Sequence, residues 1–147
     1  MQQKFRRMDI DKLNDDFAKI AELVIKLDSM DYSDETYDDV EEELHDLEDA
    51  MMDEFGDYLE EAIQGVYDNL CPDSDVLLPT AYIAKHYTRK QKDNQGRYSY
   101  EVEYGEGIPI ESDQFGDQEV YLSLVPGATR LVVTVGETAK QTVWMAK

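Results

Sequence analysis

The sequence contains a single cysteine, and it has no lysine or arginine between Lys26 and Lys85. One cysteine can neither form an internal disulfide nor build a metal site by itself, which is typical of proteins in a reducing compartment. No run approaches the roughly 18 apolar residues that a membrane span needs. The basic start of the chain is not followed by the apolar segment of a signal peptide. The sequence therefore predicts a soluble, cytoplasmic protein that does not associate with membranes.

Motifs specific to a reaction are also missing, since G-x-S-x-G, G-x-x-x-x-G-K and H-E-x-x-H do not occur. Glu42 and His45 have the E-x-x-H spacing of di-iron carboxylate bundles, but the only other histidine, His86, falls in a predicted strand. An EF-hand loop starting at Asp31 would place Thr36 where the sharp turn requires glycine. We therefore predict no catalytic, cofactor-binding or metal-binding residue, and a non-enzymatic function is favoured.

Negative charge is what the sequence has in excess, and it is unevenly distributed. The net charge is −20, from 34 acidic and 14 basic residues. Residues 1–70 contain 23 Asp and Glu against 6 Lys and Arg, a net of −17, whereas residues 71–147 contain 11 against 8, a net of −3. A strongly acidic surface repels nucleic acids and anionic membranes, so cations and basic proteins are the better partners.

Two amphipathic helices are predicted in the first half of the chain. Apolar residues recur three and four positions apart over residues 10–28, which predicts a helix with Asp9 as its N-cap. The same spacing predicts a second, very acidic helix that has Ser33 as its N-cap and ends at Leu70. Because the connection between the two is short, the helices should be antiparallel neighbours.

The apolar stripe of the second helix is narrow at first and broadens from Met51 onward. At 1.5 Å per residue the first helix is about 28 Å long and covers the second only to about residue 53. Gly56 lies close to this change of partner, where it is expected to mark a bend or a close approach of two backbones, or to be neutrally tolerated. We expect the half before Gly56 to pair with the first helix and the half after it to cover a sheet.

After Pro72 the apolar pattern changes to a period of two, and the following stretches are predicted to be strands: residues 81–90, 97–104, 119–125, 129–135 and 140–146. The links are too short for crossover helices, which predicts an antiparallel meander. Residues 105–116 are predicted to be a loop or an irregular edge that contains Pro109.

The expected fold is a single α+β domain over residues 1–147. An antiparallel helical hairpin in residues 1–71, with a long acidic second helix, packs on a roughly five-stranded antiparallel β-meander in residues 72–147.

Two charged surfaces are candidate binding sites. On the acidic helix, carboxylates four residues apart repel one another by about 0.2–0.5 kcal/mol per pair, a pattern that a purely solubilising surface would also have. The candidate partner-binding residues there are Asp38, Asp39, Glu42, Glu43, Asp46, Asp49 and Asp53. A second, basic surface is expected at the tip of the first hairpin, formed by Lys85, Arg89, Lys90, Lys92 and Arg97.

The leading functional hypothesis is a non-enzymatic cytoplasmic protein-binding module, inhibitor-like or immunity-like, that presents its acidic helical face to a basic protein. One alternative is a structural or self-assembling protein that forms a homodimer through its helical hairpin. A further alternative is a metal-dependent enzyme that uses carboxylates. No cofactor is expected, and the total charge disfavours nucleic acid as a partner of the basic surface.

Overall fold

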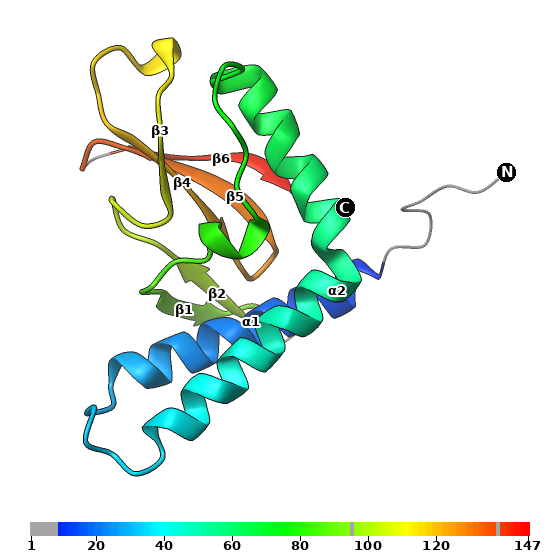
Figure 1. Cartoon of the computed structure of the whole chain (residues 1–147), viewed down its shortest axis with the longest axis vertical. Helices are drawn as coiled ribbons and strands as arrows, with labels where there is room; N and C mark the ends of the chain where they lie inside the picture. The colour runs from blue at the N-terminus through cyan, green and yellow to red at the C-terminus, as the bar shows by residue number, and fades with distance from the viewer. Residues whose placement is uncertain (1–8, 95, 138) are drawn as a thin grey trace, which may run out of the picture.

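The computed structural model describes residues 9–94, 96–137 and 139–147. Helices α1 (Ile10–Asp28) and α2 (Tyr37–Leu70) form an antiparallel hairpin, and the rest of the described chain forms antiparallel sheets and two short 3-10 helices (Figure 1). The predicted α+β fold, with a long second helix, is confirmed. Across these residues, no helix combines the length and the apolar character that crossing a membrane requires.

Helix α1 forms where the sequence predicts it. The Asp9 side chain accepts a hydrogen bond from the backbone N–H of Lys12 at 2.9 Å, which satisfies one of the free amides of the first turn. Leu13, Phe17 and Ile20 are completely buried and form the apolar face of the helix. This face joins α1 to the common core.

Helix α2 begins at Tyr37, so the prediction that Ser33 is its N-cap is wrong. Aspartate side chains fold the preceding residues into turns. Asp31 accepts a hydrogen bond from the N–H of Ser33 at 3.1 Å, and Asp34 accepts one from the N–H of Thr36 at 2.9 Å. Such local bonds give the backbone an alternative to the helix, which therefore starts after them. The predicted C-terminal end of α2 is confirmed.

Helix α2 changes direction near its middle, and its two halves have different neighbours (Figure 1). The first half lies beside α1, while the second half lies over the four-stranded sheet, where the Tyr58 ring packs edge-on against Trp144 at 5.6 Å between centroids. A Cβ added to Gly56 would first meet Met52 of the same helix, at 3.3 Å. Gly56 is thus not a close approach of two backbones, and the bend fits the freedom of a mid-helix glycine.

The strands divide between two sheets and do not form one meander of five. The smaller sheet is the hairpin of β1 (Thr88–Lys92) and β2 (Tyr98–Glu101). The larger sheet has the antiparallel order β3 (Ile108–Ile110), β4 (Val120–Val125), β5 (Arg130–Val135) and β6 (Ala139–Met145). β3 lies in the stretch predicted to be a loop or an irregular edge. It is a three-residue strand that contains Pro109, which suits its edge position. The short helices are η1 (Pro79–Tyr82) and η2 (Asp113–Phe115).

The first predicted strand, residues 81–90, is wrong over its first half, because η1 and an irregular segment precede β1. Two buried tyrosines hold this segment by tertiary hydrogen bonds in place of a strand ladder. The Tyr82 hydroxyl lies 2.6 Å from the hydroxyl of Tyr67 on α2, and the Tyr87 hydroxyl donates to the backbone oxygen of Leu124 at 2.7 Å. Burial raises the pKa of the Tyr87 hydroxyl, so it stays a neutral donor. The segment is thereby fixed to both α2 and β4.

Candidate functional site

The predicted partner-binding carboxylates all lie on the first half of α2, and all of them are exposed. They are Asp38, Asp39, Glu42, Glu43, Asp46, Asp49 and Asp53, which we call the acidic face. At about 100° of rotation per residue, Glu42, Asp49 and Asp53 fall within about 40° of one another around the helix axis. The buried Val40 lies on the opposite side. The helix therefore presents one continuous carboxylate surface to solvent.

The acidic face has no cation to neutralise it within the described chain. Helix α2 contains 14 Asp and Glu and no Lys or Arg, so no lysine or arginine of its own can pair with its carboxylates. The ion pairs that the described lysines and arginines make with carboxylates all involve acids outside the acidic face. Its negative potential is therefore left for solvent ions or a partner to screen.

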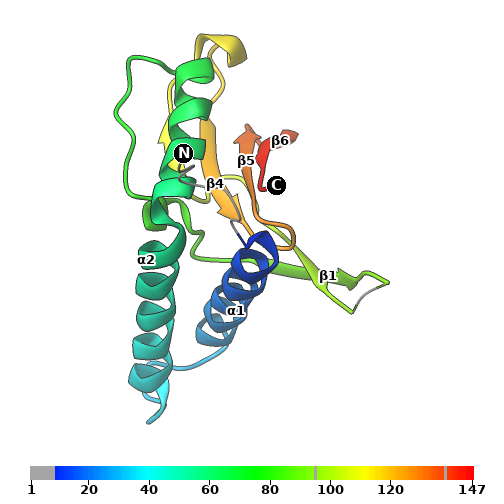
Figure 2. The ribbon, with the colours of Figure 1, turned by 90° about the vertical axis from the view of Figure 1, so that its right-hand side faces the viewer.

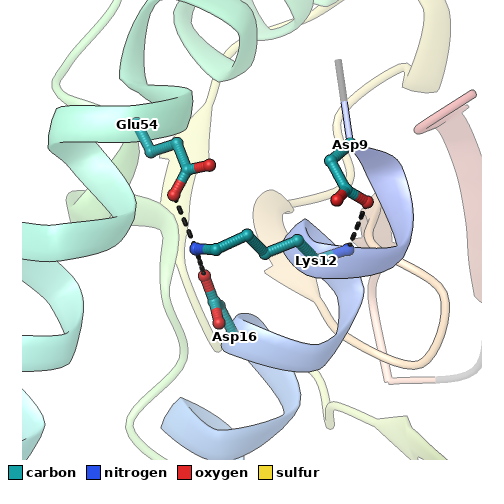
Figure 3. A network of polar contacts seen from close by, with 4 residues as sticks. All are labelled: Asp9, Lys12, Asp16 and Glu54. Carbon is teal, nitrogen blue, oxygen red and sulfur yellow. Dashed lines mark hydrogen bonds and ion pairs between the residues drawn. The ribbon is translucent and has the colours of Figure 1, made fainter. Parts of the chain in front are cut away.

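A different carboxylate of α2 serves the contact with α1. The ammonium of Lys12 lies 2.8 Å from Asp16 of its own helix and 2.6 Å from Glu54 of α2, so it bridges the two helices (Figure 3). Its hydrogen bonds to Asp16 and then to Glu54 raise the pKa of Lys12 above its usual value. The same ammonium lies 5.6 Å from the centre of the Phe55 ring. Acids on this side of α2 are thus used to join the helices.

The predicted basic residues are exposed but are not gathered at a hairpin tip. Lys85 precedes β1, Arg89 and Lys90 lie within that strand, and only Lys92 and Arg97 border the turn. The first strand was predicted to end at Lys90, whereas β1 continues to Lys92, which leaves Arg89 and Lys90 within the strand. The hairpin lies against α1, so part of this basic surface faces acids of that helix.

Glu22 of α1 is the main contact between that helix and the β1–β2 hairpin. Its carboxylate accepts two hydrogen bonds from the Arg89 guanidinium, one of them at 2.8 Å, and a third from the Tyr100 hydroxyl at 2.5 Å. The bonds from Arg89 hold the pKa of Glu22 below its usual value despite partial burial. Burial and the neighbouring carboxylate together raise the pKa of Tyr100.

Further ion pairs of the basic residues are also made within the chain. Arg97 lies 3.9 Å from Asp11 of α1, and Lys90 lies 3.2 Å from Glu101 on the neighbouring strand. The Lys92 ammonium lies 5.0 Å from the centre of the Tyr98 ring. These contacts use much of the positive charge of the surface, and we interpret it mainly as the part of the hairpin that holds α1.

His86 belongs to the same region and contacts the end of α1. Its Nδ1 lies 2.7 Å from the carboxylate of Asp28 at the end of α1, and this hydrogen bond raises the pKa of the imidazole. The two residues are 58 positions apart in the sequence, so only the packing of the hairpin on α1 brings them together. No local sequence signal could have found this pair.

Metal ligands do not gather in this structure: no three His, Cys, Asp or Glu side chains of the described residues are close enough together to hold an ion. Two open grooves have comparable size. One, of about 480 Å³, lies between α2 and β6, and the other, of about 520 Å³, lies between α1 and the β1–β2 hairpin. Neither contains a residue of the acidic face.

The chain shows no significant similarity to any protein-family model, curated protein or solved structure. The acidic face must therefore be interpreted from its own geometry and charge.

Proposed function

We propose that the protein is a non-enzymatic binding module whose acidic face engages a basic protein. The observation that supports this proposal is the contrast in charge pairing within the described residues. Lys12 of α1 and Arg89, Lys90 and Arg97 of the hairpin are each paired with an acid, whereas the seven exposed carboxylates of the acidic face have no cationic partner there. A surface that is left uncompensated in this way can recognise positive charge.

Repulsion between the carboxylates of the unbound acidic face lowers the stability of the fold. Four of its pairs are four residues apart on α2: Asp38/Glu42, Asp39/Glu43, Glu42/Asp46 and Asp49/Asp53. At 0.2–0.5 kcal/mol each, their repulsion amounts to about 1–2 kcal/mol at low salt. A basic partner would relieve this repulsion, and the field of the face would steer the partner during diffusional encounter. Inhibitors and immunity proteins of basic enzymes are the class of module that fits this chemistry.

Affinity capture from a native lysate can test the proposal with two matched variants. The first replaces the seven carboxylates of the acidic face by Asn or Gln. The second makes the same replacement at seven exposed acids outside α2: Asp73, Asp75, Glu103, Glu111, Asp113, Asp117 and Glu137. Each variant changes the net charge from −20 by +7 to −13, so the two remove the same charge from different surfaces.

We expect the unchanged chain and the second variant to capture the same basic protein, and the first variant to lose it. Raising the salt concentration should release the protein, because screening weakens an electrostatic contact between exposed groups. Equal loss by both variants would mean that total charge and not the acidic face is recognised. If no basic protein is captured in a salt-sensitive way, the proposal is wrong.

The two alternatives have less support. A homodimer through the helical hairpin would need an apolar outer surface, but among the described residues of that hairpin Tyr32 is the only large apolar side chain that is exposed. It stacks on Tyr37 at the closed end of the hairpin, with 4.8 Å between ring centroids. Metal-dependent catalysis has no cluster of ligands to support it in the described part of the chain.

A further inference from the structure

The C-terminal end of α2 carries negative charge that no basic residue of its last turn offsets. The aligned peptide dipoles of a helix place partial negative charge at this end, and a lysine or arginine is favoured there. The last turn of α2 contains neither. It contains Asp68 instead, and Glu61 lies about two turns earlier. The end of this long helix therefore attracts positive charge from outside the chain.

A groove of about 480 Å³ opens beside this helix end, between the second half of α2 and β6. In Figure 2 this half of the helix lies along one side of the four-stranded sheet. Among the described residues that line the groove, Glu61 is the one carboxylate, and none is Lys, Arg or His. Gly65 also lines it, and a Cβ added there would meet nothing within 4 Å. The groove is therefore negatively charged and has room for an organic molecule.

Trp144 of β6 gives the groove an aromatic wall. Its ring is half-buried and packs against Tyr58 of α2, with 5.6 Å between ring centroids. The Tyr58 hydroxyl accepts a hydrogen bond from the backbone N–H of Lys147 at 3.2 Å, which helps to hold the two rings in place. Tryptophan is the aromatic side chain that attracts cations most strongly. Trp144 therefore offers both apolar surface and an attraction for positive charge.

Neutral polar side chains complete the lining of the groove. Gln114 donates from its side-chain nitrogen to the backbone oxygen of Asn69 at 2.7 Å, which fixes its amide at the groove. Gln141 and Thr142 add further oxygen atoms from β6. An ammonium group donates three hydrogen bonds and accepts none, so it matches a carboxylate surrounded by neutral oxygens. A metal ion fits less well, because no three His, Cys, Asp or Glu side chains of the described residues lie together.

We propose that this groove binds a small organic amine. The ammonium group lies near Glu61 and the C-terminal end of α2, and the apolar part of the ligand lies against Trp144. An anionic ligand is repelled by the net charge of −20, and a neutral one gains nothing from Glu61. The site is separate from the acidic face, because Asp53 is about 12 Å from Glu61 along the helix. Amine binding and the binding of a basic protein can therefore fail independently.

Titration of the full chain with three probes that share a phenyl group tests the proposal. The probes are phenethylamine, which is positively charged, 2-phenylethanol, which is neutral, and 3-phenylpropionate, which is negatively charged. Calorimetry measures the affinity, and fluorescence of Trp144, the only tryptophan in the chain, reports on the groove itself. We expect phenethylamine to bind about tenfold more tightly than 2-phenylethanol, and 3-phenylpropionate not to bind. Added salt should weaken the binding of phenethylamine.

Two pairs of matched variants locate the binding site. Glu61→Gln should raise the dissociation constant of phenethylamine about threefold. Glu60→Gln removes the same charge from an exposed neighbour that does not line the groove, and it should have little effect.

Gly65→Leu places a side chain in the free space of the groove and should abolish binding, whereas Gln64→Leu, at an exposed position outside the lining, should not. Thermal melts check that both leucine variants are folded. The proposal is overturned if phenethylamine does not bind, or if 2-phenylethanol binds equally well. It is also overturned if Glu61→Gln and Glu60→Gln have equal effects, or if a folded Gly65→Leu variant binds like the unchanged chain.

Discussion

The β1–β2 hairpin and the first half of α2 both carry dense charge, but they use it differently. On the hairpin, Arg89 and Arg97 contact acids of α1, and the cations support the packing of one element on another. On α2, the acidic face has no cationic partner within the described chain, and its charges repel one another. The difference teaches that charge in one region serves the fold while charge in the other opposes it.

Apolar burial explains why α2 forms in spite of this repulsion. Met51, Phe55, Leu59 and Ile63 are each at most 1% exposed, and burying one large side chain contributes about 1.5–3 kcal/mol. The repulsion of the whole acidic face is about 1–2 kcal/mol, comparable to one such side chain. The stripe therefore fixes the helix, and the composition of the exposed face is free to serve another purpose.

The largest change in stability should come from weakening the apolar stripe of α2. Phe55→Ala removes a ring that packs between α1 and α2, and we expect the free energy of unfolding to fall by about 3–5 kcal/mol. Urea unfolding followed by circular dichroism measures the loss. Leu77→Ala, at a side chain that is 46% exposed, is the control and should change stability by less than about 0.5 kcal/mol. A similar loss in both variants would mean that the stripe does not dominate the stability of α2.

Neutralising the acidic face should make the protein more stable, in contrast to Phe55→Ala. With all seven carboxylates replaced by Asn or Gln, we expect a gain of about 1–2 kcal/mol in the free energy of unfolding, from the repulsion removed. The gain should shrink at high salt, where the repulsion is already screened. Thermal unfolding at low and high salt measures both effects. The matched variant at seven acids outside α2 should gain less, and a destabilised face variant would contradict the comparison.

Removing the charge of Glu22 should destabilise the protein. Glu22→Gln keeps the shape of the side chain but weakens its bonds from Arg89 and Tyr100, and we expect a loss of about 1–2 kcal/mol at neutral pH, given partial exposure. Because folding lowers the pKa of Glu22, this contribution is present above the unfolded value of 4.5 and is lost as pH falls through the folded pKa. Chemical unfolding at pH 7 and at acid pH measures the difference.

Glu103→Gln is the control for that experiment, because Glu103 is exposed and lies outside α1 and α2. It should change stability little at either pH. If Glu22→Gln and Glu103→Gln behave alike, the ion pairs of the hairpin contribute as little as ordinary exposed pairs.

The smallest change in stability should come from replacing His86. Folding raises its pKa above 6.5 through Asp28, so its contribution is fully present below 6.5 and is lost as pH rises through the folded pKa. His86→Gln should flatten this part of the stability profile, which a series of thermal melts across neutral pH measures. Asp28→Asn should flatten it in the same way. A slope that persists in both variants would rule out the pair as its source.

The sequence predicted those parts of the fold that depend on local periodicity. The apolar spacing located α1 and most of α2, and alternation located β4, β5 and β6 to within a residue or two at their ends. The start of α2 was missed because the turn bonds of Asp31 and Asp34 compete with helical ones. The first half of the first predicted strand was wrong because tertiary bonds of Tyr82 and Tyr87 hold that segment, and periodicity does not report such bonds.

The candidate site, like the fold, could be predicted from the sequence only in part. Exposure of the acidic face follows from its position opposite the apolar stripe, so the sequence could predict it. The pairing of Arg89 with Glu22 and of His86 with Asp28 could not be predicted, because the members lie 67 and 58 residues apart. Only the packing of the hairpin on α1 brings these partners within hydrogen-bond distance.

The sequence separation of the Glu22 contacts also has a kinetic consequence. The helical hairpin and the β3–β6 sheet are each built from neighbouring segments, whereas Glu22 receives its bonds from residues 67 and 78 positions away. Such contacts close long loops and should form late, after both parts have structure. Glu22→Gln should then speed unfolding and leave the folding rate nearly unchanged, so that this carboxylate lengthens the time the assembled molecule stays folded.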